Sequence, residues 1–408
     1  MCSVLAVAEL LTVEDALARV LAAVRPLESE AVTLSAASGR VLSEDARAAV
    51  DLPRFASSAM DGFAVRAADT PGTLPVVGQV AAGRPAERAL AAGEAMTIST
   101  GGVVPEGADA VVPIELVTQE GDTVAIAQAA PHGANVRPRG GDVVAGDVVV
   151  PAGTPLTPPR LAALASTGVT TLLCSCRPKV SIVSTGTELR QPGEALREGE
   201  IYESNGLMLA ALLAGSGADV RPLGHVEDDP AAHEAALARG LECDVLVTSG
   251  GVSVGPHDLV RETLTRLGVE ETFWGVAMRP GKPLSFGTRE GVLVFGLPGN
   301  PVSSLVGALL FLLPAIRALQ GRRHPEPGFG VGTLAAPAAR RASRDDFQRA
   351  AVERVGDDVV LTPLAGQESH MIARAAAADA LVHVPRGDGE LSAGSRVRYL
   401  PLDGSAGA

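Results

Sequence analysis

Hydrophobic and polar positions follow different periods in successive parts of the chain. Between residues 13 and 25, apolar residues recur at helical spacing, with Val13, Leu17 and Val20 on one face and Thr12 in front as an N-cap. This pattern predicts an amphipathic helix. The segment from 30 to 50 mixes short strand and helix signals.

The pattern changes between residues 53 and 140, where short β-like pieces alternate with Gly and Pro turns. It predicts a small, mostly β domain. Its expected strands are Leu74–Val80, Ala95–Ile98, Ala110–Pro113 and Thr123–Ile126. Residues 143–176 return to strand and helix signals, with the helix at Pro158–Thr167. We therefore expect an N-terminal helical and extended domain of residues 1–52 plus 141–177, with a β-rich domain of residues 53–140 inserted in it.

From residue 178 to about 320, strands and helices alternate regularly. The expected strands are Lys179–Val183, Asp219–Val226, Asp244–Thr248, Glu271–Ala277 and Gly291–Phe295, and the expected helices are Asn205–Ala214, Pro230–Leu241, His257–Leu267 and Pro301–Leu319. Such alternation predicts βαβ units, a mostly parallel sheet and helices on both of its faces. We expect an α/β domain over residues 178–326 and a small β domain over residues 327–408.

Composition limits the possible functions. The chain has 408 residues, 46% of them hydrophobic, which is enough for several globular domains. The net charge of −13 argues against binding to nucleic acid or anionic membranes. The N-terminus lacks a basic region and the apolar run Leu305–Leu313 is too short to span a bilayer, so we expect a cytoplasmic protein. Four cysteines form neither a disulfide framework nor a zinc-ligand cluster.

Three strand ends of the α/β domain carry loops rich in glycine and hydroxyl residues. Ligands of open α/β sheets bind beyond the carboxyl ends of strands, glycine lets the backbone approach them closely, and helix N-termini attract phosphates. One such loop alone could be a tight turn, but three in one sheet predict a phosphate-bearing ligand. The candidate binding residues are Ser184, Thr185, Gly186, Ser249, Gly250, Gly251, Ser253, Pro298, Gly299, Asn300 and Ser303. Neither a Walker A motif nor a dinucleotide fingerprint is present.

Charged residues lie near the same strand ends. Arg279 and Lys282, in a Pro- and Gly-rich loop, suit a phosphate or oxyanion, although the loop could also be a plain exposed turn. Glu188, Asp228 and Asp258 could hold Mg²⁺, which prefers oxygen ligands, although the two aspartates could also cap helices. Further stretches of small residues at 57–66, 97–102 and 135–142 are compatible with plain loops.

A series of motifs runs along nearly the whole chain: SAMDGFAVR (58–66), STGGVVPEGADAVVP (99–113), NVRPRGGDV (135–143), STGTEL (184–189), IYESN (201–205), TSGGVSVGPHD (248–258), RPGKP (279–283) and GLPGNPVSS (296–304). In these motifs and their order, the sequence resembles the molybdopterin molybdenumtransferase family, which includes MoeA and the E domain of gephyrin. The resemblance implies an elongated homodimer of four-domain subunits. It also implies a molybdopterin-binding α/β sandwich and a small C-terminal β-barrel.

The resemblance further implies an insertase of molybdenum cofactor biosynthesis. The expected substrates are adenylyl-molybdopterin and molybdate, the products are molybdenum cofactor and AMP, and Mg²⁺ is the cofactor. The implied site residues are Asp61, Thr100, Asp142, Glu188, Asp228, Asp258, Arg279, Lys282 and Ser369. The first three lie in the β-rich region and are expected to reach the α/β site of the partner subunit. A molybdopterin adenylyltransferase and molybdoenzyme maturation proteins are expected partners.

The chain departs from the family pattern at two positions where a lysine is common. Family members often carry Lys where this chain has Gly275 and Arg279. Arginine keeps the charge but changes its geometry, whereas the loss of a cation at 275 predicts weaker molybdate binding.

Three alternative functions remain open. One is a paralogue that handles tungstate. Another is an adenylyltransferase or nucleotide pyrophosphatase, against which the β-rich and C-terminal domains argue. The third is a scaffold like gephyrin, but nothing in the chain resembles the extra linker and trimerising domain of that role.

Overall fold

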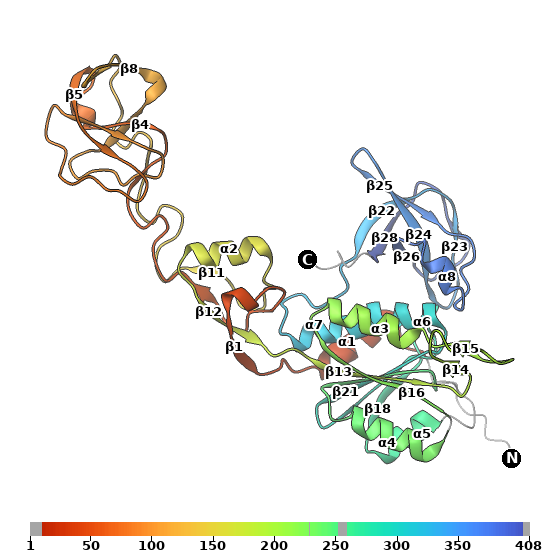
Figure 1. The fold of residues 1–408 in the computed structure, drawn as a ribbon. Helices are drawn as coiled ribbons and strands as arrows, with labels where there is room; N and C mark the ends of the chain where they lie inside the picture. Colours follow the sequence, from red (N-terminus) through yellow and green to blue (C-terminus); the bar gives the residue numbers. More distant parts are fainter. Residues whose placement is uncertain (1–9, 228, 252–258, 403–408) are drawn as a thin grey trace, which may run out of the picture.

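The computed structural model describes residues 10–227, 229–251 and 259–402. The chain is elongated, as Figure 1 shows. The β-rich domain lies at one end, a narrow connecting domain follows it, and the α/β domain and the C-terminal domain lie together at the other end.

The α/β domain is built on a six-stranded sheet in the order β16-β13-β17-β21-β20-β18. The strands are β13 (Lys179–Thr185), β16 (Asp219–Val226), β17 (Val245–Ser249), β18 (Glu270–Trp274), β20 (Ser285–Arg289) and β21 (Val292–Leu297). The first four neighbours are parallel, which confirms the predicted α/β core. Strand β20 was not predicted, and it runs antiparallel to both β21 and β18.

The hairpin that joins β20 to β21 explains why the sequence did not reveal β20. Its two turn residues, Glu290 and Gly291, both have positive φ, at 50° and 90°. A two-residue turn of this kind usually has Asn or Asp in its first position, because those residues tolerate the left-handed region. Because position 290 is a glutamate, the sequence lacks the usual indication of a hairpin turn, and the antiparallel edge of the sheet was not predicted.

Helices cover both faces of this sheet (Figure 1). On one face lie α4 (Pro230–Gly240) and α5 (Leu259–Arg266); on the other lie α1 (Val13–Ala23), α3 (Asn205–Gly215), α6 (Pro301–Gly307) and α7 (Leu313–Leu319). One π-helical turn, Ala308–Leu312, joins α6 to α7. Ala16 and Val20 of α1 are fully buried in the same core as these helices. Helix α1 therefore packs in the α/β domain, whereas the sequence grouped it with residues 29–52.

The helical stretch Pro301–Leu319 is the one helix, within the described ranges, that is long and apolar enough to cross a membrane. Its mean hydropathy is 2.0, and 89% of its most apolar window is buried inside the protein. It extends beyond the run Leu305–Leu313 on both sides. The apolar side chains of this helical stretch are buried in the core, where the helix packs between the sheet and the C-terminal domain (Figure 1).

The connecting domain combines segments from both sides of the β-rich region. Its elements are β1 (Ser29–Thr33), which pairs with β12 (Thr171–Ser175), β2 (Ala46–Arg47), which pairs with β11 (Val148–Val150), and α2 (Pro158–Ser166). Leu42, Leu156 and Leu164 are among its buried residues. The β-rich region thus leaves this small core and returns to it.

The β-rich domain has a six-stranded sheet in the order β7-β4-β6-β5-β9-β8. Its strands are β4 (Gly62–Val65), β5 (Gly72–Val80), β6 (Ala95–Ile98), β7 (Ala110–Pro113), β8 (Val117–Glu120) and β9 (Thr123–Ile126), and the short pair β3 (Ser57–Ser58) and β10 (Val136–Arg137) lies beside it. Two hydrophobic clusters form its interior, around Phe63 and Val65 and around Val80 and Met96.

The C-terminal domain is a closed five-stranded barrel, which confirms the expected β-barrel. Its pairings run β24-β25-β22-β28-β26 and back to β24. The elements are β22 (Gly330–Leu334), β24 (Asp345–Val355), β25 (Asp358–Pro363), β26 (Ala380–Val384), β28 (Arg396–Pro401), the pair β23 (Ala338–Ala339) and β27 (Glu390–Leu391), and α8 (Ile372–Ala375). Strand β19 (Met278–Arg279) of the α/β domain pairs with the start of β24, so the barrel is hydrogen-bonded to the loop that carries Arg279.

Candidate active site

The three predicted strand-end loops lie side by side, because β13, β17 and β21 are neighbours in the sheet. Asn205, at the start of α3, connects two of them. Its amide nitrogen donates to Ser249 Oγ at the end of β17 and to the carbonyl oxygen of Gly299 after β21, both at 2.8 Å. The backbone of Gly250 donates to Leu297 at 3.0 Å.

The end of β13 is held by a buried acid. Ser184 Oγ donates to Glu203 Oε1 at 3.0 Å, and the backbone N–H of Gly206 donates to the same oxygen at 2.7 Å. Residues at the start of α3 and just before it therefore hold the ends of β13 and β17 and the loop after β21. Glu203 and Asn205 were not among the predicted site residues, although Asn205 ends the motif IYESN.

Glycine is required where these loops meet. Gly250 has φ of +96°, and a Cβ atom there would lie 2.7 Å from the carbonyl oxygen of Thr185. Gly251 has φ of +62°, and a Cβ atom there would lie 2.3 Å from a methyl group of Val260. The backbone therefore approaches its neighbours more closely than any side chain would allow. Ser253 of the same loop lies outside the described residues.

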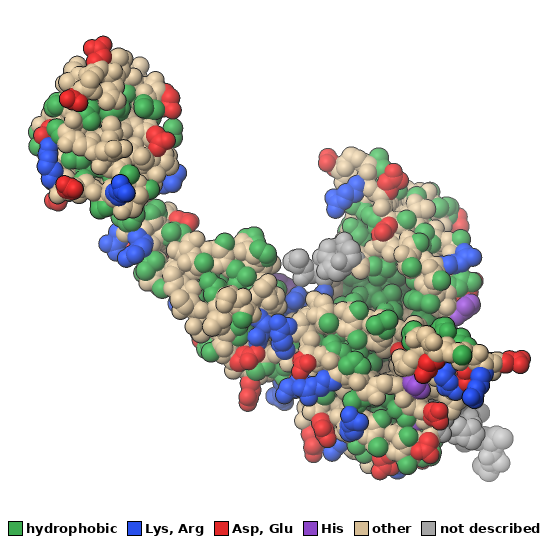
Figure 2. Space-filling view, in the orientation of Figure 1, with side chains coloured by type: hydrophobic (Ala, Val, Ile, Leu, Met, Phe, Trp, Pro, Cys, Tyr) green, Lys and Arg blue, Asp and Glu red, His purple; other side chains and the backbone are tan. Residues whose placement is uncertain are grey.

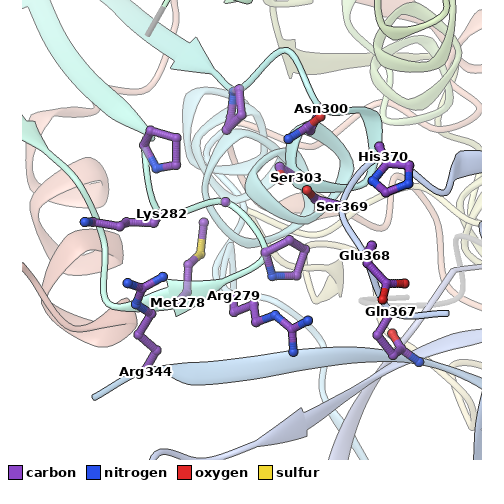
Figure 3. Close-up of a pocket in the computed structure, with 14 residues that line it drawn as sticks. Met278, Arg279, Lys282, Asn300, Ser303, Arg344, Gln367, Glu368, Ser369 and His370 are labelled. Atoms are coloured by element: carbon purple, nitrogen blue, oxygen red, sulfur yellow. The ribbon is translucent and has the colours of Figure 1, made fainter. Parts of the chain in front are cut away.

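A cavity of about 400 Å³ opens between the α/β domain and the barrel (Figure 3). The α/β domain contributes Met278, Arg279, Pro280, Gly281, Lys282, Pro283, Pro298, Asn300 and Ser303, and the barrel contributes Arg344, Gln367, Glu368, Ser369 and His370. Among the predicted residues, the cavity thus brings together Arg279, Lys282, Pro298, Asn300, Ser303 and Ser369. Asn300 also follows Gly299, so the cavity and the strand-end loops are continuous.

The cavity is rich in cations. Figure 3 shows Lys282 and Arg344 on one side, with Ser303 and Ser369 on the other. Neither Lys282 nor Arg344 has a carboxylate partner among the residues described. A second recess of about 500 Å³ adjoins the cavity through Arg279 and Arg344 and is lined by residues 340–344. Positive charge without a counterion suits an oxyanion that carries two negative charges.

Arg279 is held differently from the other two cations. Its Nη1 lies 3.3 Å from Asp346 Oδ2, and the Asp346 side chain is only 4% exposed. The same carboxylate also faces Arg341 Nε at 3.6 Å. Asp346 therefore orients Arg279 from the barrel side and offsets part of its charge. A lysine at position 279 would provide only one compact ammonium for this contact.

The sequence analysis missed the barrel side of the cavity except for Ser369. Arg344 stands in the basic segment 340–344, which has arginines at 340, 341 and 344, and Glu368 and His370 flank Ser369. The basic run was the available signal for Arg344. Nothing local indicated that residues so distant in sequence face the RPGKP loop.

Of the three predicted metal ligands, the structure describes only Glu188. Asp228 and Asp258 lie outside the described residues. The Glu188 carboxylate lies close over Gly186, where a Cβ atom would be 2.6 Å from Oε2. Within the described ranges it has no hydrogen-bond or ion-pair partner, and no group of three or more possible metal-binding side chains is found there.

Asp61 and Thr100 lie together in the β-rich domain and do not line the cavity of their own chain. Asp61 Oδ1 accepts the backbone N–H of Thr100 at 2.6 Å and its hydroxyl at 3.0 Å. The backbone N–H and then the hydroxyl of Thr100 lower the pKa of Asp61, although burial opposes them. Figure 1 shows this domain at the opposite end of the chain from the barrel.

Asp142 was expected in the β-rich region but lies outside its sheet. Its backbone N–H donates to the carbonyl oxygen of Leu52 at 3.0 Å, next to the bridge between Leu52 and Val143. It therefore belongs to the two chain segments that connect the β-rich domain to the rest of the molecule. Its side chain is exposed.

The departure at Gly275 has a structural basis. Gly275 has φ of +87°, and a Cβ atom there would lie 2.7 Å from Leu10 Cδ2. Gly275 is not part of the cavity lining. A lysine at position 275 would therefore strain the backbone and come too close to Leu10.

We therefore expect Gly275→Lys to lower the free energy of unfolding and to leave oxyanion affinity unimproved. The left-handed backbone alone costs about 1–2 kcal/mol, and the contact with Leu10 adds to it. Urea unfolding gives the stability and calorimetry with molybdate gives the affinity. Gly268→Lys is the matched control, since Gly268 has φ of +83° but open space around it. A more stable or tighter-binding Gly275→Lys variant would contradict this account.

Three family models match consecutive parts of the chain. They are the MoeA N-terminal region (domain I and II) at residues 11–168, a probable molybdopterin binding domain at 181–318, and the MoeA C-terminal region (domain IV) at 331–402.

Curated relatives match along nearly the whole chain. The molybdopterin molybdenumtransferase of Haemophilus influenzae is 35% identical over 385 residues, 93% of this chain and 95% of the relative. Molybdopterin molybdenumtransferase 2 of Mycobacterium tuberculosis is 37% identical over 400 residues, 94% of this chain and 97% of the relative.

Solved structures agree with this assignment. A molybdopterin biosynthesis moeA protein from Pyrococcus horikoshii OT3 superimposes with a TM-score of 0.85 at 28% identity, over 97% of this chain and 100% of that chain. A second structure of a Pyrococcus horikoshii moeA protein gives a TM-score of 0.81 at 31% identity, over 96% and 99% of the two chains. With its three matched regions and these full-length relatives, this chain belongs to the molybdopterin molybdenumtransferase family, as a transferase enzyme of molybdenum cofactor biosynthesis.

Proposed function

We propose that the enzyme inserts molybdenum into molybdopterin, converting adenylyl-molybdopterin and molybdate to molybdenum cofactor and AMP. The observation that carries this proposal is the cation-rich cavity between the α/β domain and the barrel. Lys282 and Arg344 line it without a carboxylate partner among the described residues. Molybdate is a dianion that must approach an already anionic pterin phosphate, and these cations would offset the repulsion.

The strand-end loops suit the phosphate part of the substrate. The Ser184–Gly186 and Ser249–Gly251 segments bring glycine and hydroxyl residues together at one edge of the sheet, where Gly251 is exposed, and Asn205 holds the end of β17 against the loop after β21. Asn300, next to Gly299, lines the cavity. A substrate laid across these loops would therefore place its pterin end near the cations.

The donor set also fits Mg²⁺, with Glu188, Asp228 and Asp258 as the proposed ligands. The Glu188 carboxylate, unpaired among the described residues, is the kind of oxygen ligand that Mg²⁺ prefers. When bound, Mg²⁺ would neutralise charge on the phosphoanhydride that is cleaved. Arg279, Lys282 and Arg344 would meanwhile hold the oxyanion by hydrogen bonds and charge.

We also propose that the active enzyme is a homodimer in which Asp61 and Thr100 reach the partner's site. The hydrogen bonds from Thr100 keep Asp61 in one orientation on the surface of the β-rich domain. In a dimer of elongated chains with twofold symmetry, the same contact forms twice. The substrate would come from an enzyme that adenylylates molybdopterin, and the product would pass to proteins that mature molybdoenzymes. We propose the cytoplasm as the compartment of the enzyme.

The test uses the purified chain with adenylyl-molybdopterin, Mg²⁺ and either molybdate or tungstate. We expect AMP release to depend on molybdate, and AMP release that needs no oxyanion would instead indicate a nucleotide pyrophosphatase. A preference for tungstate would identify a tungstate-handling paralogue. The shared site is tested by mixing Asp61→Ala with Arg344→Ala subunits. Each variant alone should lose most of its activity, and mixed dimers should regain part of it. No recovery would contradict the shared site.

A further inference from the structure

A buried arginine lies beneath the barrel side of the cavity. Arg349, on β24, is only 1% exposed. Among the described residues it has no carboxylate within ion-pair distance. A buried charge is costly unless hydrogen bonds satisfy it. The hydrogen-bond acceptors of this guanidinium therefore indicate its structural role.

Those partners all belong to one short segment, Gly366–Met371. Arg349 Nη1 donates to the carbonyl oxygen of Met371 at 2.6 Å. Its Nη2 donates to the carbonyl oxygens of Gly366 and, at 3.2 Å, of Glu368. Three backbone carbonyls of the segment thus point at one guanidinium.

Gln367 completes the attachment from the other direction. Its side-chain oxygen accepts the backbone N–H of Arg349 at 2.9 Å, and its side-chain nitrogen donates to the Arg349 carbonyl oxygen at 2.8 Å. Segment and strand are therefore joined by both the side chain and the backbone of residue 349. Gly366 supplies φ of +75°, which lets its carbonyl turn toward the strand.

The same segment forms a wall of the cavity. Gln367, Glu368, Ser369 and His370 all line it. The carbonyl oxygen of Ser369 also accepts the N–H of Val302, near the start of α6, at 3.1 Å. A shift of the segment would move these side chains relative to Lys282 on the other side of the cavity.

We propose that Arg349 is a positioning residue, which sets the geometry of the cavity through the segment Gly366–Met371 and touches no substrate itself. The planar guanidinium satisfies three carbonyls at once. A lysine ammonium is a compact point charge and cannot match that fork. Burial lowers the pKa of Arg349; the charge of Glu368 opposes this effect and that of Arg374 adds to it.

The kinetic part of the test rests on the proposed function. In Arg349→Lys we expect kcat/KM for molybdate-dependent AMP release to fall on the order of 10²-fold, as for a displaced binding group. We expect amide hydrogen exchange to accelerate in Gly366–Met371 while the rest of the barrel keeps its protection. In Arg349→Ala, millimolar methylguanidinium should restore part of the activity and of the protection. A residue that only stabilises the fold would not give local exchange or rescue.

Arg317→Lys is the matched control. Arg317 is 8% exposed and donates to a backbone carbonyl, that of Glu326, but it is not part of the cavity lining. This variant should keep wild-type exchange in Gly366–Met371. Wild-type kinetics and exchange in Arg349→Lys would overturn the proposal, as would a loss of protection spread evenly over the barrel.

A failure of the proposed function can be distinguished from a failure of the role proposed for Arg349. If the unaltered enzyme releases no AMP in response to an oxyanion, the proposed function fails, but the exchange measurement still decides the role of Arg349. If Arg349→Lys does not fold, Gln367→Leu removes the second attachment and should give the same local exchange. Unchanged exchange in Gln367→Leu would then count against the proposal.

Discussion

Replacing Arg344 by Ala should reduce kcat/KM for the molybdate-dependent reaction by a factor on the order of 10²–10³, as when one preorganised donor to a developing anion is removed. Arg344 lines the cavity from the barrel side, opposite Ser303 and Ser369 (Figure 3). Unlike Arg279, it has no carboxylate partner among the described residues to share its charge. Steady-state kinetics with varied molybdate would measure the loss.

Two further variants, one conservative and one control, show whether the loss of activity is specific to Arg344. Arg344→Lys keeps the charge but loses the bidentate geometry, so its activity should lie between those of wild type and Arg344→Ala. Arg354→Ala, an exposed position further along β24, should behave as wild type. Equal activity of Arg344→Ala and Arg354→Ala would remove Arg344 from the site. It would also weaken the assignment of the cavity as the oxyanion site.

Replacing Asn205 by Asp should destabilise the α/β domain by roughly 2–4 kcal/mol at neutral pH, since buried acceptors lose their donor. The side chain of Asn205 is buried and donates to Ser249 and Gly299. A carboxylate there has no proton to give, and its charge would face the carbonyl oxygen of Gly299. Urea unfolding at several pH values would measure the change.

The pH dependence of Asn205→Asp follows from linkage. Burial and the facing carbonyl oxygen of Gly299 raise the folded-state pKa of the new acid above its unfolded value of about 3.9. Between these two values the folded state holds a proton that the unfolded state has released. Stability should therefore fall as the pH rises from about 4 through the folded pKa, relative to wild type. Asn300→Asp, at an exposed position, is the control and should show little of this dependence.

The structure adds barrel residues to the predicted site, and it places Asp142 away from the cavity. The sequence indicated Arg279, Lys282 and Ser303 because each follows a strand of the α/β domain within a short glycine- and proline-rich loop. Local spacing could not indicate Arg344 or Glu368, since they come from the barrel. It also placed Asp142 in the β-rich region, whereas the residue lies in the connection.

In the fold, too, some elements could be predicted from local sequence and others could not. Parallel strands such as β13 and β17 were predictable, because continuous apolar runs between helices are a local signal. Strand β20 was not, since it depends on a turn whose first residue is Glu290. The position of α1 also depends on packing: its apolar face indicated a helix but could not show that it would be buried against α7.

The sequence by itself therefore determined the α/β core, the three glycine-rich strand ends and the family. These depend on short-range periodicity, on backbone conformations that only glycine adopts readily, and on motifs read in order. Only the tertiary structure decided that the cavity has a second wall. Strand β24 brings Asp346 against Arg279 and Arg349 against Gly366–Met371. The first contact forms when the barrel docks on the α/β domain and the second when the barrel itself folds. Both join residues that are distant in sequence, so no local pattern encodes them.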